Sequence, residues 1–475
     1  MRQYLLFIPL FFSAIGLLTA QSTFSSVLSS SERNGDALYS ALIADLPSGE
    51  IIEEYQSSSM MLPASVVKLV TTASALKLLP EYPFITDFKI SGEIDNGCLK
   101  GDLVIYGSGD PSLFSKYIPA DSIRFKESLM AMLSSRGIRQ IEGGVVVVAD
   151  CFERQGFNPY WEEEDRGEWY GCGIYGFNLF DNWIKLYFQT KARGSKPILI
   201  SQYPSNTHTV YQNELSVVAK GAYSHALGEE LVNKRILKGA LLPHLKRVRI
   251  SIDLPNPPQF GASFITDLLR GKGIVVKEEG KAIFKPYENQ TKLIGQYYGP
   301  SLETLIRTCN MYSLNHYAEA LLKRMALEVN TIGSTQGGIA AEKALWKRKL
   351  SLLSKGARLV DGSGLSRSNR LSACDLYKVL FAMYKDSDHF QSFIQSLPEA
   401  GKEGSVRRFL INTPYKAFLK SGSMQGVLCY AGYITNADKK YIVVLLSNNV
   451  QNRMKVRQAM QGALEKVVLA PQIEK

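Results

Sequence analysis

The sequence predicts an α+β protein, in which helices flank an antiparallel sheet and smaller domains are inserted. Two apolar segments near the start, 38–45 and 51–55, flank a Pro-Ser-Gly turn and read as an antiparallel hairpin. A second strand pair, 427–434 and 441–446, lies near the end, and an amphipathic helix over 452–468 follows it. Between these segments a helix–strand pattern occurs twice, which indicates an insertion.

Composition narrows the class of protein. The chain has 475 residues, 45% of them hydrophobic and 21% charged, which is typical of a packed globular protein and excludes disorder, collagen and coiled coil. A length of this order suggests about three domains. The net charge of +11 is spread without a basic run, so we expect no nucleic-acid partner. The excess indicates attraction to an anionic polymer or, more simply, a solvated basic surface.

The first twenty residues are typical of a secretory signal. Arg2 precedes an apolar run over 4–18, and Thr19-Ala20 offers a small residue at the expected cut, so the signal peptide is assigned to 1–20. We expect a soluble protein exported to the periplasm or cell envelope. An uncleaved anchor is the alternative, but the run is short for a bilayer span of about 20 residues. No integral span is expected after cleavage.

Cysteine and histidine usage bears on disulfides and metals. Export would allow the six cysteines to pair, and Cys151 with Cys172 is the favoured pair, although the spacing leaves the connectivity open. The five histidines show no His-Glu-x-x-His spacing, and the cysteines show no Cys-x-x-Cys. We therefore expect neither a metal nor another cofactor.

Between the hairpin and the last strands, the sequence shows a helix that is apolar on all sides and a repeated helix–strand pattern. The segment 65–79 is apolar at nearly every position except Lys68, which predicts a helix buried on all sides. The pattern of 121–148, a helix, a basic residue before Gly-Ile, then Glu-Gly and a strand, recurs over 258–284, where Lys-Gly-Ile takes the place of Arg-Gly-Ile. The repeat predicts one domain split by a nested insertion over 151–256, unless two amphipathic helices resemble each other by chance.

A helix break is predicted near residues 310–315. Apolar residues at 302, 305, 306 and 309 form one helical stripe, and those at 318, 321, 322 and 325 form another that is out of phase with it. Ser313 and Asn315 therefore lie on a corner between two helices.

Ser65 and Lys68 lie three positions apart, so on a helix they share one face and can touch. A nucleophilic hydroxyl and its base need that geometry, and burial would depress the lysine pKa enough for it to accept a proton. The pair taken alone also fits an N-cap serine and a lysine that snorkels to the surface.

The order of three short motifs favours a catalytic role for these residues over a purely structural one. Ser65-x-x-Lys68 is followed by Ser313-x-Asn315, and then by Lys420-Ser421-Gly422 before a strand. This triple signature is typical of penicillin-interacting serine enzymes. Ser421 replaces the usual threonine and keeps its hydroxyl. Each motif alone also fits an ordinary turn or strand entry, but all three in this order do not.

With the loops 106–111 and 361–367 and the long gap between the first two motifs, the sequence resembles the class C low-molecular-mass penicillin-binding proteins over nearly the whole mature chain. These are D-alanyl-D-alanine carboxypeptidase/endopeptidases of the penicillin-binding protein 4 type. The resemblance implies a penicillin-binding transpeptidase/beta-lactamase-like domain, a five-stranded antiparallel sheet with helices on both faces. It implies the following division: catalytic domain 21–84 and 291–475, inserted domain 85–150 and 257–290, nested domain 151–256.

The resemblance also implies roles in acylation. Ser65 would attack the penultimate D-Ala carbonyl, Lys68 would take its proton, and Ser313 would relay a proton to the leaving amine. Asn315 would hold the substrate amide. Lys420 would lower the pKa of Lys68. The backbone N–H groups of Ser65 and of Ser423 would form the oxyanion hole.

Substrate recognition is implied for a second group of residues. Lys420, with the hydroxyls of Ser421 and Ser423 beside Gly422, would hold the terminal carboxylate. Asp165, in the stretch 161–170, is the candidate for the charged end of the diamino acid before the D-Ala pair. Arg367 and Gln425 would be its cleft partners for carboxylate and amide groups, and an ordinary solvated acidic loop is the alternative for Asp165.

The expected partners are peptidoglycan stem peptides, with beta-lactams as inhibitors. A beta-lactamase would share the motifs but would not need the long insertion, and a catalytically silent wall-binding protein would not need the intact motif residues. The balance between trimming the terminal D-Ala and cutting crosslinks stays open.

Overall fold

The computed structural model describes residues 23–350 and 353–469, so the expected signal peptide lies outside the described residues. The strands nearest the two ends of this region form one sheet in the order β18-β19-β20-β1-β2, with every neighbouring pair antiparallel. The predicted α+β class and both predicted strand pairs are confirmed. The strands are β1 (Leu38–Asp45), β2 (Ile51–Tyr55), β18 (Lys416–Met424), β19 (Val427–Asn436) and β20 (Lys439–Asn448).

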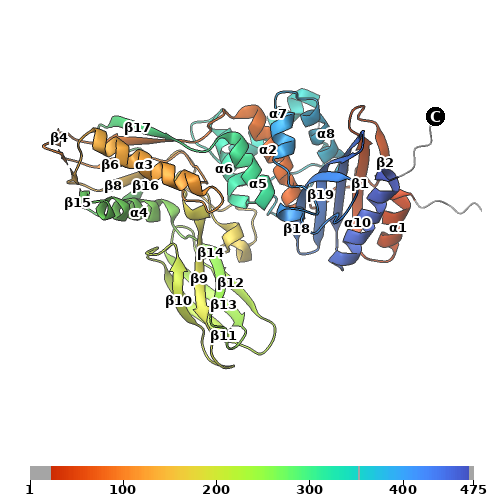
Figure 1. Cartoon of the computed structure of the whole chain (residues 1–475), viewed down its shortest axis with the longest axis horizontal. Coiled ribbons are helices and arrows are strands. Elements are labelled where there is room, and N and C mark those ends of the chain that lie inside the picture. Colours follow the sequence, from red (N-terminus) through yellow and green to blue (C-terminus); the bar gives the residue numbers. More distant parts are fainter. Residues whose placement is uncertain (1–22, 351–352, 470–475) are drawn as a thin grey trace, which may run out of the picture.

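Helices cover both faces of this sheet (Figure 1). Successive residues of β1 point to opposite faces. Ala41 and Ile43 pack in a cluster with α1 (Phe24–Arg33) and α10 (Arg453–Val468), whereas Leu42 and Ala44 pack in the larger core with helices of the other face. That other face carries α2 (Lys68–Leu78), α5 (Leu302–Tyr312), α6 (Asn315–Ala326), α7 (Thr335–Leu350), α8 (Ala373–Tyr384) and α9 (Phe390–Gln395).

The buried helix and the helix break both occur where the sequence predicts them. Helix α2 is buried along nearly its whole length, but it is preceded by a 3₁₀ turn, η1 (Ala64–Val67), so that Ser65 lies just before the α-helix. Helix α5 ends at Tyr312 and α6 begins at Asn315. Ser313 takes a left-handed conformation, with φ 58, at this corner.

The two halves of the repeated pattern lie side by side. Helix α3 (Pro119–Ser135) precedes β7 (Gln140–Ile141) and β8 (Val145–Val148), and α4 (Pro257–Gly271) precedes β15 (Val275–Val276) and β16 (Lys281–Ile283). Strand β15 pairs in parallel with β7, and β16 with β8. Their sheets are completed by β3 (Ile85–Ile90), β4 (Ile94–Asp95), β5 (Cys98–Leu99), β6 (Leu103–Tyr106) and β17 (Lys292–Tyr298).

Residues between the repeats form two three-stranded sheets that hang from the rest of the molecule (Figure 1). The chain enters them through three short 3₁₀ turns, and Phe152 and Ile174 from this entry belong to the core beneath the catalytic sheet. The elements are η2 (Glu163–Asp165), η3 (Trp169–Gly171), η4 (Phe180–Asn182), β9 (Trp183–Gln189), β10 (Ile198–Tyr203), β11 (Val210–Val217), β12 (Tyr223–Leu227), β13 (Lys234–Leu241) and β14 (Val248–Asp253). The exact division into domains stays a prediction.

The predicted Cys151–Cys172 disulfide is wrong, because all six cysteines are free thiols. The Cys151 thiol lies against the Gly176 carbonyl at 3.7 Å and the Cys172 thiol against the Asp181 carbonyl at 3.8 Å. Within the described residues no cluster of three potential metal ligands occurs. No described helix is long and apolar enough to cross a membrane.

Candidate active site

The first two motifs meet at the side chain of Lys68. Its Nζ lies 3.1 Å from Ser65 Oγ and 2.7 Å from Asn315 Oδ1, and it donates to the Ser363 carbonyl at 2.7 Å. The side chain is fully buried. Among the described residues no carboxylate forms an ion pair with it, so the amine faces a hydroxyl and two neutral oxygen acceptors.

The backbone around Ser65 is held tightly by glycines on two sides. Ala64 takes a left-handed φ of 49, which a non-glycine residue rarely adopts. A side chain at Gly364 would collide with the Ala64 carbonyl, and one at Gly422 would come within 2.5 Å of the Pro63 carbonyl and 3.2 Å of the Ser65 nitrogen. Only glycine at 422 lets strand β18 lie this close to the nucleophile turn.

The second and third motifs meet at Lys420. Its buried Nζ donates to Ser313 Oγ at 2.9 Å and to its neighbour's carbonyl, that of Ser421, at 2.8 Å. The Ser421 hydroxyl donates to Ser405 Oγ at 2.8 Å. The left-handed corner between α5 and α6 is what turns Ser313 toward β18. The three motifs that the sequence picked out therefore form one cluster.

Burial controls the protonation of both lysines. It lowers the pKa of Lys68 to about 8, although Cys309, Asp361 and Glu319 act in the opposite direction. Burial, followed by the positive charge of Lys68, holds the pKa of Lys420 well below its usual value. The two buried cations repel each other, so each favours the neutral form of the other, and the expectation that Lys420 lowers the pKa of Lys68 stays a prediction.

A buried carboxylate pair supports the loop behind Lys68, and the sequence-based reasoning missed its role. Glu319 accepts from the Gly362 and Ser363 N–H groups at 3.1 and 2.8 Å, which aims the Ser363 carbonyl at Lys68. Asp361 accepts from the Gly364 N–H at 2.8 Å. Burial, and next the charge of Asp361, raises the pKa of Glu319 to about 7. Its position one helical turn after Asn315 was the available signal.

The residues expected to read the diamino acid also lie together. Burial raises the pKa of Asp165, and the positive charge of Arg367 acts in the opposite direction, as a neighbouring cation does. Arg367 Nη1 and Nη2 donate to the Gln425 backbone carbonyl at 3.4 and 3.3 Å. Gln425 therefore contacts Arg367 through its backbone carbonyl and not through its side-chain amide. Nearby, Asn315 Nδ2 donates to the Tyr170 carbonyl at 2.8 Å, so the nested segment reaches the catalytic cluster.

One cation at the edge of the site was not found from the sequence. The Ser423 hydroxyl, which is exposed, accepts a hydrogen bond from Arg453 at the start of α10. The guanidinium also donates to the Met424 carbonyl. A second positive group therefore lies beside the serines expected to hold a carboxylate, and no local pattern around Arg453 indicates it.

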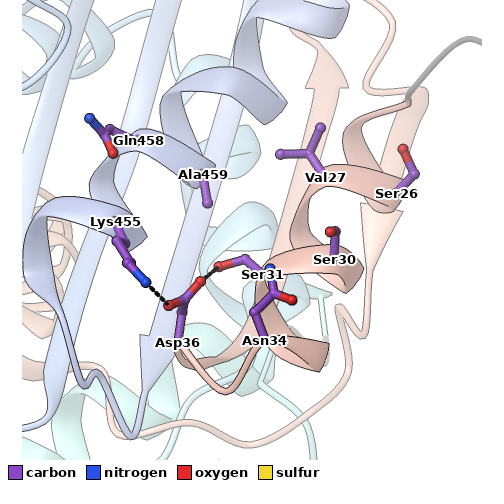
Figure 2. A pocket seen from close by; sticks show the side chains of 9 residues that line it. All are labelled: Ser26, Val27, Ser30, Ser31, Asn34, Asp36, Lys455, Gln458 and Ala459. Carbon is purple, nitrogen blue, oxygen red and sulfur yellow. Dashed lines mark hydrogen bonds and ion pairs between the residues drawn. The ribbon is translucent and has the colours of Figure 1, made fainter.

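A polar groove between α1 and α10 lies apart from these motifs (Figure 2). Its acidic group, Asp36, accepts from Ser31 Oγ at 3.0 Å and lies 3.7 Å from Lys455 Nζ. No residue of the three motifs lines it, because both helices cover the opposite face of the catalytic sheet.

Comparison with known proteins gives a family match. The model of the D-Ala-D-Ala carboxypeptidase 3 (S13) family matches residues 21–467. The D-alanyl-D-alanine carboxypeptidase DacB of Haemophilus influenzae is 26% identical over 401 residues, 82% of this chain and 80% of that protein. The D-alanyl-D-alanine carboxypeptidase of Actinomadura sp. (strain R39) is 23% identical over 429 residues, 87% of this chain and 78% of that protein.

A solved structure has the same fold. The crystal structure of penicillin binding protein 4 from Haemophilus influenzae aligns with a TM-score of 0.78 and 23% identity, covering 91% of this chain and 97% of that one. The same protein complexed with a beta-lactam aligns with a TM-score of 0.76 and 24% identity, covering 91% and 96%. These likenesses agree with the penicillin-binding fold expected from the motifs.

Proposed function

Because the chain belongs to the D-Ala-D-Ala carboxypeptidase 3 (S13) family, we propose that Ser65 is the nucleophile of its reaction and Lys68 the general base. The protein is a D-Ala-D-Ala carboxypeptidase, a hydrolase. The observation that carries the assignment of residues is the contact of 3.1 Å between Lys68 Nζ and Ser65 Oγ, made by an amine that is buried and lacks a carboxylate partner among the described residues.

Acylation starts with proton transfer. With a pKa of about 8, Lys68 is neutral in about one molecule in ten at pH 7 and takes the proton of Ser65 as its oxygen attacks the penultimate D-Ala carbonyl. The Asn315 oxygen and the Ser363 carbonyl hold the amine in line. The N–H groups of Ser65 and Ser423 stabilise the oxyanion, each typically by ~2.7 to 4 kcal/mol.

The leaving D-Ala needs a proton on its nitrogen and a partner for its carboxylate. Ser313 Oγ, which accepts from Lys420 at 2.9 Å, relays that proton. The carboxylate is bound by the hydroxyls of Ser421 and Ser423 next to Lys420, and Arg453 adds charge beside Ser423. Gly422 keeps this strand against the nucleophile. Water then hydrolyses the acyl-enzyme with the same base.

The rest of the substrate lies toward the nested segment. Asp165 binds the ammonium and Arg367 the carboxylate of a zwitterionic diamino acid such as meso-diaminopimelate, with Gln425 beside them. The contacts between Arg367 and Gln425 support this grouping. Peptidoglycan stem peptides are the substrates, and beta-lactams acylate Ser65 as inhibitors. A substrate of the cell wall and the apolar run over 4–18 support export to the periplasm or cell envelope.

Covalent labelling with a fluorescent penicillin tests this assignment. Ser65→Ala should abolish labelling and leave the far-UV circular dichroism unchanged, because only the hydroxyl is lost from a well-packed turn. Ser58→Ala, in the exposed turn before the motif, is the matched control and should label like wild type. Labelling that survives in Ser65→Ala removes Ser65 from the mechanism, and a label that wild type sheds rapidly identifies a lactamase.

A further inference from the structure

A row of aromatic side chains begins where the second motif ends. Tyr312, which directly precedes Ser313, is 52% exposed, and its ring centroid is 4.6 Å from that of Tyr117. The Tyr117 ring lies 6.3 Å from Trp183, which stacks on Trp169 at 4.8 Å. We call Tyr312, Tyr117, Trp183 and Trp169 the aromatic strip.

The strip is attached to the catalytic cluster at both ends. Tyr312 is adjacent in the chain to Ser313, and Trp169 is adjacent to Tyr170, whose carbonyl accepts from Asn315 Nδ2 at 2.8 Å. Trp183 opens strand β9, so the strip continues from the corner of α5 and α6 onto the sheet that hangs below it (Figure 1). A ligand on the strip therefore lies next to a substrate in the site.

Cations accompany the aromatic rings. Lys116 Nζ lies 4.1 Å from the centroid of Trp183 and 4.5 Å from that of Tyr117. Lys185 follows Trp183 by two residues on β9, and Arg249 lies on the neighbouring strand β14, so all three side chains point to one face of that sheet. Partial burial, and next the charge of Lys185, lowers the pKa of Lys116; Asp181 acts in the opposite direction, and Arg249 adds a smaller lowering effect.

One acidic group, Asp181, lines the same small hollow as Lys116 and Lys185, so it offsets only part of the charge of the three cations. Asp181 is buried, accepts from Ser115 Oγ at 2.5 Å and lies 3.6 Å from His316 Nε2. Within the described part of the chain, none of Lys116, Lys185 and Arg249 forms an ion pair. Tyr312 and Trp169, which are 52% and 38% exposed and are joined by the buried Trp183 and the half-buried Tyr117, therefore offer π-faces beside positive charge, which fits an anionic ligand with flat apolar faces.

We propose that the aromatic strip and its three cations bind the glycan-linked portion of the peptidoglycan substrate. Hexopyranose rings present apolar C–H faces to the exposed rings of Tyr312 and Trp169, and carboxylates of the attached peptides pair with Lys116, Lys185 and Arg249. The inference deepens the proposed function and rests on it. It also gives a use to the basic excess of the chain, +11, in attracting an anionic polymer.

Comparing two substrates distinguishes binding at the aromatic strip from catalysis. One is a free pentapeptide ending in D-Ala-D-Ala, and the other is the same pentapeptide carried on soluble glycan chains. The double variant Lys116→Ala/Lys185→Ala and the single variant Tyr312→Ala should each lose about tenfold in kcat/KM on the glycan-linked substrate. Both should keep wild-type kcat/KM on the free peptide and wild-type rates of penicillin labelling.

The controls take an exposed lysine and an exposed tyrosine from elsewhere. Lys272→Ala at the end of α4 and Tyr223→Ala on β12 should leave both substrates unaffected. Equal losses on both substrates would show that the strip only supports the fold, and no loss on either would show that the polymer does not touch it. Both results overturn the inference. Failure of the wild type to release D-Ala from the free peptide would instead refute the proposed function.

Discussion

At the residue scale, the proton on Lys68 decides when Ser65 can react. Burial lowers the pKa of this amine to about 8, so below that pH the folded enzyme holds Lys68 mostly protonated and unable to accept a proton. The rate of acylation by penicillin should therefore rise about tenfold per pH unit below the midpoint and level off above about 8. Stopped-flow labelling between pH 6 and 9 measures this profile.

The substitution Lys68→Arg provides the control for that profile. Guanidinium keeps the positive charge but does not give up its proton in a protein, so the variant should acylate as poorly as Lys68→Ala. A rate near that of wild type in Lys68→Arg, or a flat profile in wild type, would make Lys68 an electrostatic partner and not the base.

At the scale of elements, the activity depends on how closely strand β18 approaches the turn η1. A methyl group at Gly422 would lie 2.5 Å from the Pro63 carbonyl and 3.2 Å from the Ser65 nitrogen. Gly422→Ala should push the strand away, misplace the oxyanion N–H groups and slow acylation by about 10².

The matched control for this glycine lies in helix α10. A methyl group at Gly462 meets only Val27 at 3.9 Å, so Gly462→Ala should acylate normally and gain about 0.5 to 1 kcal/mol of stability. Normal acylation in Gly422→Ala, read with the same fluorescent penicillin, would show that the strand tolerates the displacement.

Helix α7 buries an acidic side chain, that of Glu342, against its neighbours. Glu342 is fully buried, and within the described residues neither carboxylate oxygen has a hydrogen-bond partner. Burial, with the charges of Glu319 and Asp361, raises its pKa from 4.5 to about 8, although the nearby Thr71 hydroxyl acts in the opposite direction. The folded state thus keeps a proton that the unfolded chain loses between these values, so stability falls as the pH rises through that window.

Glu342→Gln should remove this contribution. Between pH 5 and 8 the free energy of unfolding of the variant should fall less than that of wild type, by on the order of 1 kcal/mol per pH unit while Glu342 is ionised only in the unfolded chain. Thermal unfolding at several pH values measures this as a smaller fall in Tm. The slope should not vanish, because burial also raises the pKa of Glu319 and of Asp110 to about 7. The exposed variant Glu93→Gln should track wild type, and an unchanged slope in Glu342→Gln would refute the assignment.

At the scale of the whole molecule, the residues of the three catalytic motifs lie outside the segment of the chain that forms the hanging sheets. The loop between β9 and β10 is exposed at Arg193, whereas the motif residues lie before it or well after it. Backbone pairing of β9 with both β10 and β14 should hold the chain together after a cut.

Brief trypsin digestion tests this arrangement. A nick after Arg193 should leave penicillin labelling at the wild-type level, with the label on the N-terminal fragment that carries Ser65. Undigested enzyme carried through the same buffer is the control. Loss of labelling in step with the nick would show that the hanging sheets hold the site together, and a label on the C-terminal fragment would exclude Ser65.

Much of the fold and most of the catalytic cluster could be predicted because their signals are local. Alternation and turn residues located the hairpin and the final strands, and two out-of-phase stripes placed the corner at Ser313. Motif order, read with the family resemblance, assembled Ser65, Lys68, Asn315 and Lys420, which the structure brings into contact. Periodicity and motif spacing depend only on neighbours along the chain, so the sequence alone determines them.

What only the tertiary structure decided are contacts between distant segments. The Tyr170 carbonyl on Asn315, Arg453 on Ser423 and the support of Ser363 by Glu319 join residues that no periodicity relates. The left-handed Ala64 and the separation of Cys151 from Cys172 likewise depend on how sheets and helices pack around them. Even the lowered pKa of Lys68 follows from burial, against the opposite effect of Asp361 and Glu319, and burial exists only once the chain has folded.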